Sequence, residues 1–173
     1  MSAGLEAAAA QAAVLRLGAG FFEPIAALLG RHGLELRRVE PGADIPGSYW
    51  GAPEAGLEGS VVWVRDDTPV HSALHEGCHA LCMDEARLSA LERDAGGDFE
   101  EENAVCCLQI LLAAELNGVG SERLMQDMDA WGYTFRLGSA RAWYTSEAED
   151  ARAWLVRRGL LDAFGRIAPP RAA

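Results

Sequence analysis

The segment from His75 to His79 has side chains at a spacing that can bind a metal ion and use it. It reads His-Glu-Gly-Cys-His. Residues four apart lie on the same face of an α-helix, so His75 and His79 can direct imidazole nitrogens at one point. Glu76 lies about 100° around such a helix from His75, where it can reach a water molecule on the metal. The spacing predicts a divalent-metal site with Glu76 as its general base.

The surrounding sequence favours a helix for this motif. Thr68 provides a candidate N-cap and Pro69 a proline at the first helical position. Val70 to Met83 then contains no proline and only Gly77 as a break in helix propensity. His71, one turn before His75, is a candidate extra ligand or a partner of one. The alternative is a surface helix with scattered histidines, although two histidines four apart with a glutamate between them are poorly explained by solvation alone.

A catalytic zinc site usually has a third protein ligand and leaves the fourth position to water. A long helix expected from about Phe99 to Leu116 offers two glutamates. Glu101 is expected near the centre of its apolar face, where an ionised carboxylate is costly unless it is paired or metal-bound. Glu102 is expected toward the edge of that face. We therefore predict Glu101 as the third ligand, with Glu102 as the reserve choice, and one Zn²⁺ per chain.

The elements that must position these residues indicate an α+β fold that is mostly helical, in a single domain over residues 1–173. Strands are expected over 34–40 and 60–64, and the glycine- and proline-rich loop 43–60 can carry one short strand. Helices are expected before and after this part, over 5–17, 24–31, 122–129 and 146–158. Ser121 is a candidate N-cap, and Ser146 with Glu149 is a candidate capping box.

Composition argues against several classes of function. The chain has 15 basic and 26 acidic residues, and its formal charge of -11 disfavours binding to nucleic acid or to an anionic membrane. It contains no apolar run as long as a membrane span, and no basic residue precedes Arg16 in the alanine-rich start. The four cysteines lie in expected helices, which favours reduced thiols. These features predict a cytoplasmic protein, and none of them indicates an oligomeric state.

The sequence resembles the zincin metallopeptidases, in the branch where a glutamate on a second helix completes the HExxH site. The matching residues are His75, Glu76, His79 and Glu101. The small residue that often follows the ligand glutamate by three positions is Ala104 here. Val105 stands where that branch commonly has Asp or Asn. The order of strand, loop and helices also looks like the minimal zincin domains of the ImmA/IrrE type, over residues 60–116.

This resemblance implies a small sheet packed on two helices that hold zinc between them, in a metal-site core of about 60–117 followed by a helical tail of about 121–166. It also implies that Val61–Val64 is an edge strand, where an extended peptide substrate can pair.

Other side chains are candidates for accessory roles. Tyr133 and Arg136, together with Tyr144 and Arg141, can stabilise an oxyanion over the metal, or the aromatic residues of this segment can pack over the site as a lid. Two cysteines near the motif can compete for metal or serve as small core residues: Cys78 and Cys82.

The sequence therefore predicts a zinc-dependent hydrolase that acts on a peptide or protein. Zinc would acidify a water molecule, and Glu76 would take its proton. One alternative is a non-catalytic metal-binding interaction protein, although a purely structural zinc site would need no base and would normally have four protein ligands. Another is a metal-dependent hydrolase of a non-peptide substrate.

Overall fold

The computed structural model describes residues 2–91 and 95–170 and has an α+β fold, as predicted. The two expected N-terminal helices are α1 (Ser2–Ala12) and α2 (Phe22–Arg31), with a short 3-10 helix, Leu17–Ala19, between them. The other helices, in chain order, are α3 (Val70–Cys82), α4 (Glu85–Ser89), α5 (Phe99–Ala113), α6 (Gly120–Trp131), α7 (Ala140–Ser146) and α8 (Glu149–Arg157). None of the described helices combines the length and apolar character needed to cross a membrane.

Three short strands form the sheet, in the order β1 (Glu35–Arg38), β3 (Val61–Val64) and β2 (Gly56–Glu58). β3 pairs with β1 in parallel and with β2 in antiparallel. The prediction that Val61–Val64 is an edge strand is therefore wrong. The loop over residues 39–55 carries the chain across the sheet, so that β2 returns beside β3 and occupies the edge on which a substrate was expected to pair.

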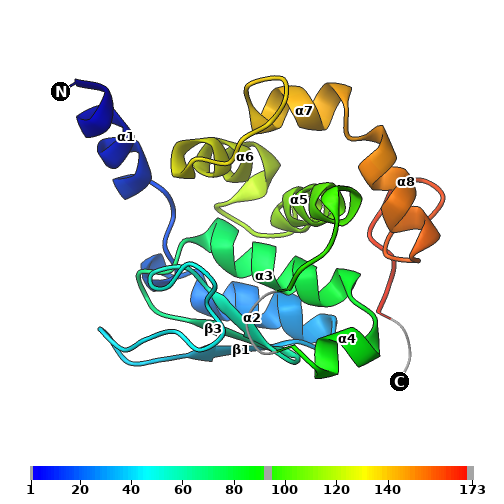
Figure 1. The fold of residues 1–173 in the computed structure, drawn as a ribbon, viewed down its shortest axis with the longest axis horizontal. Coiled ribbons are helices and arrows are strands. Elements are labelled where there is room, and N and C mark those ends of the chain that lie inside the picture. The colour runs from blue at the N-terminus through cyan, green and yellow to red at the C-terminus, as the bar shows by residue number, and fades with distance from the viewer. Residues whose placement is uncertain (1, 92–94, 171–173) are drawn as a thin grey trace.

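α3 lies at the centre of the molecule (Figure 1). The sheet and α2 pack on one side of it, and α5 packs on the other side, where α6 and α8 cover α5 in turn. The buried apolar side chains form a continuous core that reaches from Leu17 to Leu161. Because α5 is covered from several directions, every residue from Ala104 to Ile110 is buried.

Gly77, in the middle of the motif, lets α2 approach α3 closely from behind. A Cβ atom at this position would lie 2.7 Å from Leu29 Cδ2, a distance shorter than a van der Waals contact allows. Any larger side chain at this position must therefore displace Leu29 or the helix itself.

The loop over residues 39–55 is held against both the sheet and α3. A Cβ atom on Gly56 would lie 1.8 Å from the Pro46 carbonyl oxygen, so only glycine fits there. The Leu57 N–H donates to the Gly47 carbonyl at 3.4 Å, and this contact covers the outer edge of β2. The Ala55 N–H donates to Ser72 Oγ of α3 at 2.9 Å.

Three predicted helix caps are wrong, because the side chains have other partners. Thr68 Oγ1 accepts a hydrogen bond from the Arg65 N–H at 2.8 Å and closes a turn before α3, whose N-terminal residue is preceded by the extended Pro69. Ser121 lies inside α6, and its hydroxyl donates to the Ile110 carbonyl at 2.8 Å. Ser146 is the last residue of α7, and no side chain caps α8.

Candidate metal centre

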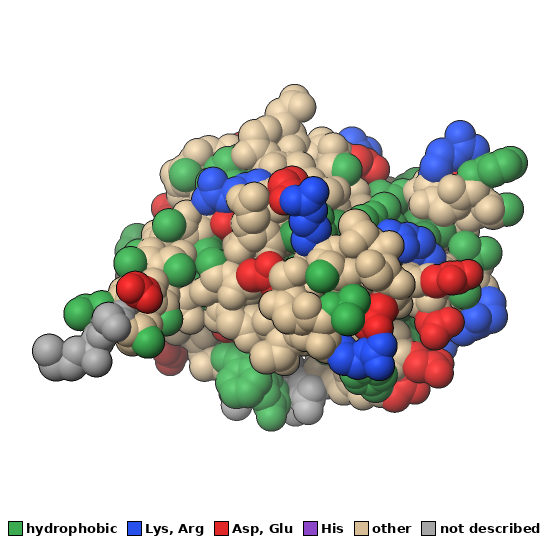
Figure 2. All heavy atoms as spheres, turned by 90° about the horizontal axis from the view of Figure 1, so that it is seen from above, with side chains coloured by type: hydrophobic (Ala, Val, Ile, Leu, Met, Phe, Trp, Pro, Cys, Tyr) green, Lys and Arg blue, Asp and Glu red, His purple; other side chains and the backbone are tan. Residues whose placement is uncertain are grey.

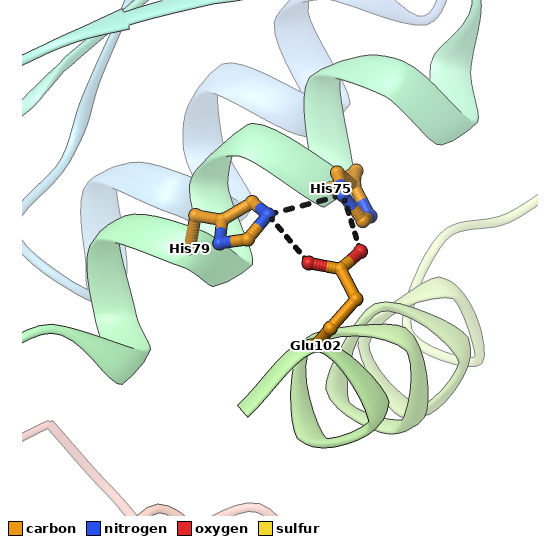
Figure 3. Close-up of side chains that lie close together, drawn as sticks. All are labelled: His75, His79 and Glu102. Carbon is orange, nitrogen blue, oxygen red and sulfur yellow. Dashed lines mark hydrogen bonds and ion pairs between the residues drawn. The ribbon is translucent and has the colours of Figure 1, made fainter. Parts of the chain in front are cut away.

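α3 brings the two motif histidines side by side (Figure 3). His75 Nε2 and His79 Nε2 are 3.1 Å apart, and the two rings are nearly perpendicular at 84°. The one-turn spacing read from the sequence therefore places both nitrogens at one point, as predicted.

α5 contributes a carboxylate to the same point. Glu102 Oε1 lies 3.2 Å from His75 Nε2, and Glu102 Oε2 lies 3.2 Å from His79 Nε2 (Figure 3). Ligand atoms placed tetrahedrally at about 2.1 Å from a zinc ion are ~3.4 Å from one another. The three side chains in this structure are therefore spaced nearly as a zinc ion would require, and their types suit it.

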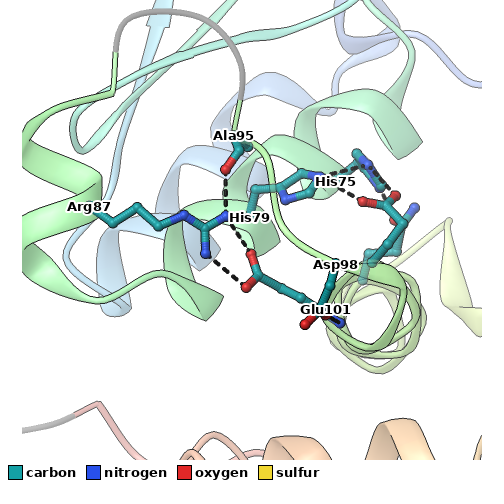
Figure 4. A network of polar contacts seen from close by, with 8 residues as sticks. His75, His79, Arg87, Ala95, Asp98 and Glu101 are labelled. Atoms are coloured by element: carbon teal, nitrogen blue, oxygen red, sulfur yellow. Dashed lines mark hydrogen bonds and ion pairs between the residues drawn. The ribbon is translucent and has the colours of Figure 1, made fainter.

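Glu101, the third ligand preferred from the sequence, lies elsewhere. It is buried as predicted, but its carboxylate accepts two hydrogen bonds of 2.8 Å from the Arg87 guanidinium of α4 (Figure 4). Arg87 also donates to the Ala95 carbonyl, and Asp98 caps α5 by accepting from the Glu101 N–H at 2.9 Å. The choice of Glu101 over Glu102 is thus corrected, because an arginine supplies the positive charge that the buried carboxylate needs.

Gln109 orients His75 within the cluster. Its Oε1 lies 2.6 Å from His75 Nδ1, and its Nε2 donates to the His71 carbonyl at 3.5 Å. An amide oxygen can only accept, so His75 donates from Nδ1 and presents Nε2 to the cluster. Sequence reasoning did not identify Gln109. The available signal was its position two helical turns after Glu102, on the same face of α5.

The second histidine has no such orienting partner. His79 Nδ1 is buried without a hydrogen bond among the described residues. Its position is fixed by the backbone of α3 and by the contacts of Nε2 with His75 and Glu102.

The charges in the cluster stabilise one another. Burial alone would raise the pKa of Glu102, but its contacts with His75 and His79 hold that pKa well below the ordinary value. Burial lowers the pKa of His75, but the contact with the ionised Glu102 carboxylate acts in the opposite direction, and the pKa is raised above its ordinary value. The carboxylate is therefore ionised and available as a ligand, whereas a metal must displace a proton from His75.

Glu76 lies next to the cluster without belonging to it. Burial raises the pKa of its carboxyl; His75 and His79 oppose this shift, and the negative charges of Glu102 and Glu54 add to it. A raised pKa makes a carboxylate a stronger base near neutral pH. The position and the electrostatic environment of Glu76 thus suit proton transfer.

The cluster and Glu76 open into a cleft of about 570 Å³. The loop over residues 39–55 contributes Tyr49, Trp50 and Glu54 to its lining, and Trp131 at the end of α6 and Tyr133 just after it also line the cleft. Cavities that bind small molecules commonly measure about 300–1,000 Å³. The cleft is large enough to hold one or two side chains of a substrate.

Tyr133 is the one candidate for oxyanion stabilisation that lines this cleft. Its hydroxyl lies 3.3 Å from Nδ1 of the buried His71, and its ring is 5.7 Å from that of His75. Burial raises the pKa of Tyr133, so the phenol keeps its proton. Burial also lowers the pKa of His71 to about 3, so this histidine is neutral. His71 therefore contacts the Tyr133 hydroxyl and is not part of the cluster of His75, His79 and Glu102.

The other candidates for this role lie away from the cleft. Arg136 pairs with Glu147 and lines a separate cavity of about 590 Å³. Arg141 pairs with Glu122 at 3.3 Å, and the ring of Tyr144 lies under the Arg152 guanidinium at 4.4 Å.

The cysteines near the motif are buried free thiols. Burial raises the pKa of Cys78 well above its ordinary value and raises that of Cys82 to about 12. Both thiols are therefore protonated, and neither belongs to the metal cluster. Their burial agrees with their interpretation as core residues.

Comparison of the chain with protein-family models, with curated proteins and with solved structures gave no match.

Proposed function

We propose that this protein is a zinc-dependent hydrolase, most simply a metallopeptidase, in which His75, His79 and Glu102 hold the metal and Glu76 is the general base. The observation that carries the proposal is the convergence of two imidazole nitrogens and a carboxylate, 3.1–3.2 Å apart, beside a glutamate that is not needed as a ligand. The proposal keeps the resemblance to the zincin metallopeptidases and changes only the third ligand.

A bound zinc ion would lower the pKa of a water molecule and polarise the substrate carbonyl. Glu76 would accept the proton of the attacking water and later deliver it to the leaving amine. The neutral Tyr133 hydroxyl would donate a hydrogen bond to the oxygen that becomes negative during the attack. Gln109 would hold the His75 ring in position during this sequence.

A peptide is the preferred substrate because the cleft is lined by aromatic side chains and is large enough to receive substrate side chains. Pairing of the substrate with β3 is no part of the proposal, since both edges of that strand are occupied. We further propose a cytoplasmic location, which the buried free thiols support.

Elemental analysis combined with the Glu76→Gln variant tests this function. The wild type should contain about one metal per chain and hydrolyse casein, peptide libraries or simple esters in a way that a hydroxamate chelator inhibits. Glu76→Gln should keep the metal, and its rate of hydrolysis should fall by about 10²-fold or more, as expected for loss of a general base. Glu58→Gln, at the exposed end of β2, controls for the loss of one carboxylate.

Equal turnover by the wild type and Glu76→Gln would refute the mechanism. A chain that stays folded but cannot be loaded with zinc would refute the metal site. A fully loaded wild type without activity on any of these substrates would instead support a non-catalytic, metal-binding interaction protein.

A further inference from the structure

The carboxylate of Glu54 lines the metal cleft and has no role in the chemistry proposed above. It accepts a hydrogen bond of 2.8 Å from Trp131 Nε1. No arginine or histidine in residues 2–91 and 95–170 lies within ion-pair distance of it. Glu54 is half-buried, and within the described part of the chain no opposite charge compensates the cost of removing its charge from water.

The contact with Trp131 does not require a charge. An indole N–H needs only an acceptor, and the amide oxygen of a glutamine would serve as well as a carboxylate. The hydrogen bond that ties the loop over residues 39–55 to the end of α6 therefore explains the position of Glu54 but not its negative charge.

The neighbouring side chains also favour a cation. Tyr49 and Trp50 line the same cleft, are 57% and 78% exposed, and form an edge-to-face pair with ring centroids 5.0 Å apart. Exposed aromatic rings attract ammonium and guanidinium groups through their electron-rich faces. The ring of Trp131 already has such a contact, with the Arg16 guanidinium 5.0 Å from its centroid.

The charged lining of the cleft is otherwise negative. Apart from the two histidines of the cluster, the charged side chains that line the cleft within residues 2–91 and 95–170 are Glu54, Glu76 and Glu102. Among the described residues, the lining of the cleft therefore contains a carboxylate without an ion pair, which can bind a positive charge.

Acidic side chains also gather on the surface toward α8, on the right of Figure 2. Those that line the second cavity, Glu147, Glu149 and Asp150, include one that is paired with Arg136 and two that lie in the first turn of α8, where they complement the helix dipole. Their charges are thus explained without a ligand, in contrast to the charge of Glu54.

We propose, on the basis of the hydrolase function above, that Glu54 together with Tyr49 and Trp50 forms a subsite for a cationic group of the substrate. This group is the side chain of lysine or arginine, or a free N-terminal ammonium, close to the bond that is cleaved. Glu54 forms the ion pair, and the two rings cover the apolar stem or face of the cation.

Binding tests the subsite without requiring turnover. Zinc-loaded Glu76→Gln protein is incubated with two peptide libraries of equal composition, one N-acetylated and one with free N-termini, and the retained peptides are identified by mass spectrometry. We expect cationic peptides to be enriched by about tenfold or more, as a charge-assisted hydrogen bond predicts. The Glu54→Gln/Glu76→Gln chain should lose this enrichment, and the Glu58→Gln/Glu76→Gln chain should keep it.

The two libraries distinguish the source of the charge. Enrichment of lysine and arginine among N-acetylated peptides assigns the subsite to a side chain, whereas enrichment only among free N-termini assigns it to the terminal ammonium. The subsite is refuted if the Glu76→Gln chain retains no cationic peptides preferentially, or if Glu54→Gln leaves the preference unchanged.

Turnover separates this result from the general proposal. If hydrolysis depends on Glu76 but the wild type and Glu54→Gln prefer the same peptides, the hydrolase function is supported and the subsite is refuted. If cationic peptides bind through Glu54 but no peptide is cleaved, the subsite stands and the hydrolase fails.

Discussion

Glu101 and Glu102 are neighbours on the first turns of α5, but their environments differ in almost every respect. The Glu101 side chain is 7% exposed and is fully engaged by Arg87. The Glu102 side chain is 47% exposed and contacts two imidazole rings at the edge of an open cleft. The first carboxylate connects α5 to α4, and the second faces the residues that can do chemistry.

The difference shows why burial alone is a poor guide to a metal ligand. A buried carboxylate needs compensation, and an arginine in the fold can provide it permanently. A ligand of a catalytic metal must instead lie where metal, water and substrate can enter. The more exposed of two adjacent glutamates is therefore the better candidate here.

The largest effect should come from removing the two carboxylates separately. We expect Glu102→Gln to weaken zinc binding by about 10³-fold or more, beyond the ~10–100-fold typical of a group that only supports a ligand. Glu101→Gln should leave zinc affinity within a few-fold of the wild type. Competition with a chromogenic chelator measures both. Loss of metal in Glu101→Gln, with retention in Glu102→Gln, would restore the ligand first predicted from the sequence.

The next effect concerns the group that orients His75. Gln109→Leu keeps the volume of the side chain but removes the acceptor at His75 Nδ1. We expect zinc affinity to fall by about 10–100-fold, because the ring loses its fixed orientation. The same chelator competition reports it. Gln109→Glu, which retains an acceptor, should recover part of the affinity; equal losses in both variants would indicate a packing defect.

The buried carboxylate of Glu101 should matter for the stability of the fold. Glu101→Gln should lower the free energy of unfolding of the metal-free protein by about 2 kcal/mol, less than for a fully buried pair because the Arg87 side chain is 34% exposed. Glu115→Gln, which breaks the exposed pair with Arg31, should cost less than about 0.5 kcal/mol.

Urea unfolding measures these changes, and a double-mutant cycle sharpens them. The Arg87→Met/Glu101→Gln chain should lose less stability than the two single changes added together, because neither group is left with an uncompensated partner. Strict additivity would mean that Arg87 and Glu101 do not stabilise each other.

The smallest effect extends the comparison to His71, a buried polar group with neither a counter-charge nor a place in the metal cluster. Its pKa is lowered to about 3, so the unfolded chain binds a proton more readily than the folded chain does. Above the unfolded pKa of about 6.5, His71 is neutral in both states and costs no stability. As the pH falls from there toward 3, His71 gains a proton in the unfolded chain only, so the free energy of unfolding decreases.

Between pH 7 and pH 6, this linkage should lower the free energy of unfolding by about 0.7 kcal/mol. His71→Asn should remove this part of the pH dependence in metal-free protein, as followed by urea unfolding at each pH. An unchanged slope in His71→Asn would show that other groups cause it.

The features predicted correctly from the sequence rest on local spacing. The helix of the motif, the meeting of His75 with His79, and the burial of Glu101 follow from helical periodicity. The choice between Glu101 and Glu102 depended on which side of α5 was taken as its apolar face, and the sequence of α5 does not define that face well. Residues Ala104 to Ile110 are buried around the whole circumference of the helix, so no single apolar face exists from which to measure it.

Tertiary contacts explain the remaining differences. Thr68 and Ser121 have the residue types of helix caps, but the nearby backbone groups of Arg65 and Ile110 engage their hydroxyls instead. The position of β3 depends on the path of the loop over residues 39–55, which propensity does not encode. Arg87 and Glu101 are 14 residues apart, with a glycine-containing break between them, so their pairing could not be read from periodicity.

The side chains that line the cleft come from two kinds of structure, the packed helices and the loop over residues 39–55. His75, Glu76, His79 and Glu102 belong to packed helices, whereas Tyr49, Trp50 and Glu54 belong to a connecting loop. Such connections accept changes in sequence and length more readily than a core does. Exchanging the segment between Pro46 and Gly56 therefore offers a route to new substrate preferences, in evolution or in the laboratory, with the cluster of His75, His79 and Glu102 left in place.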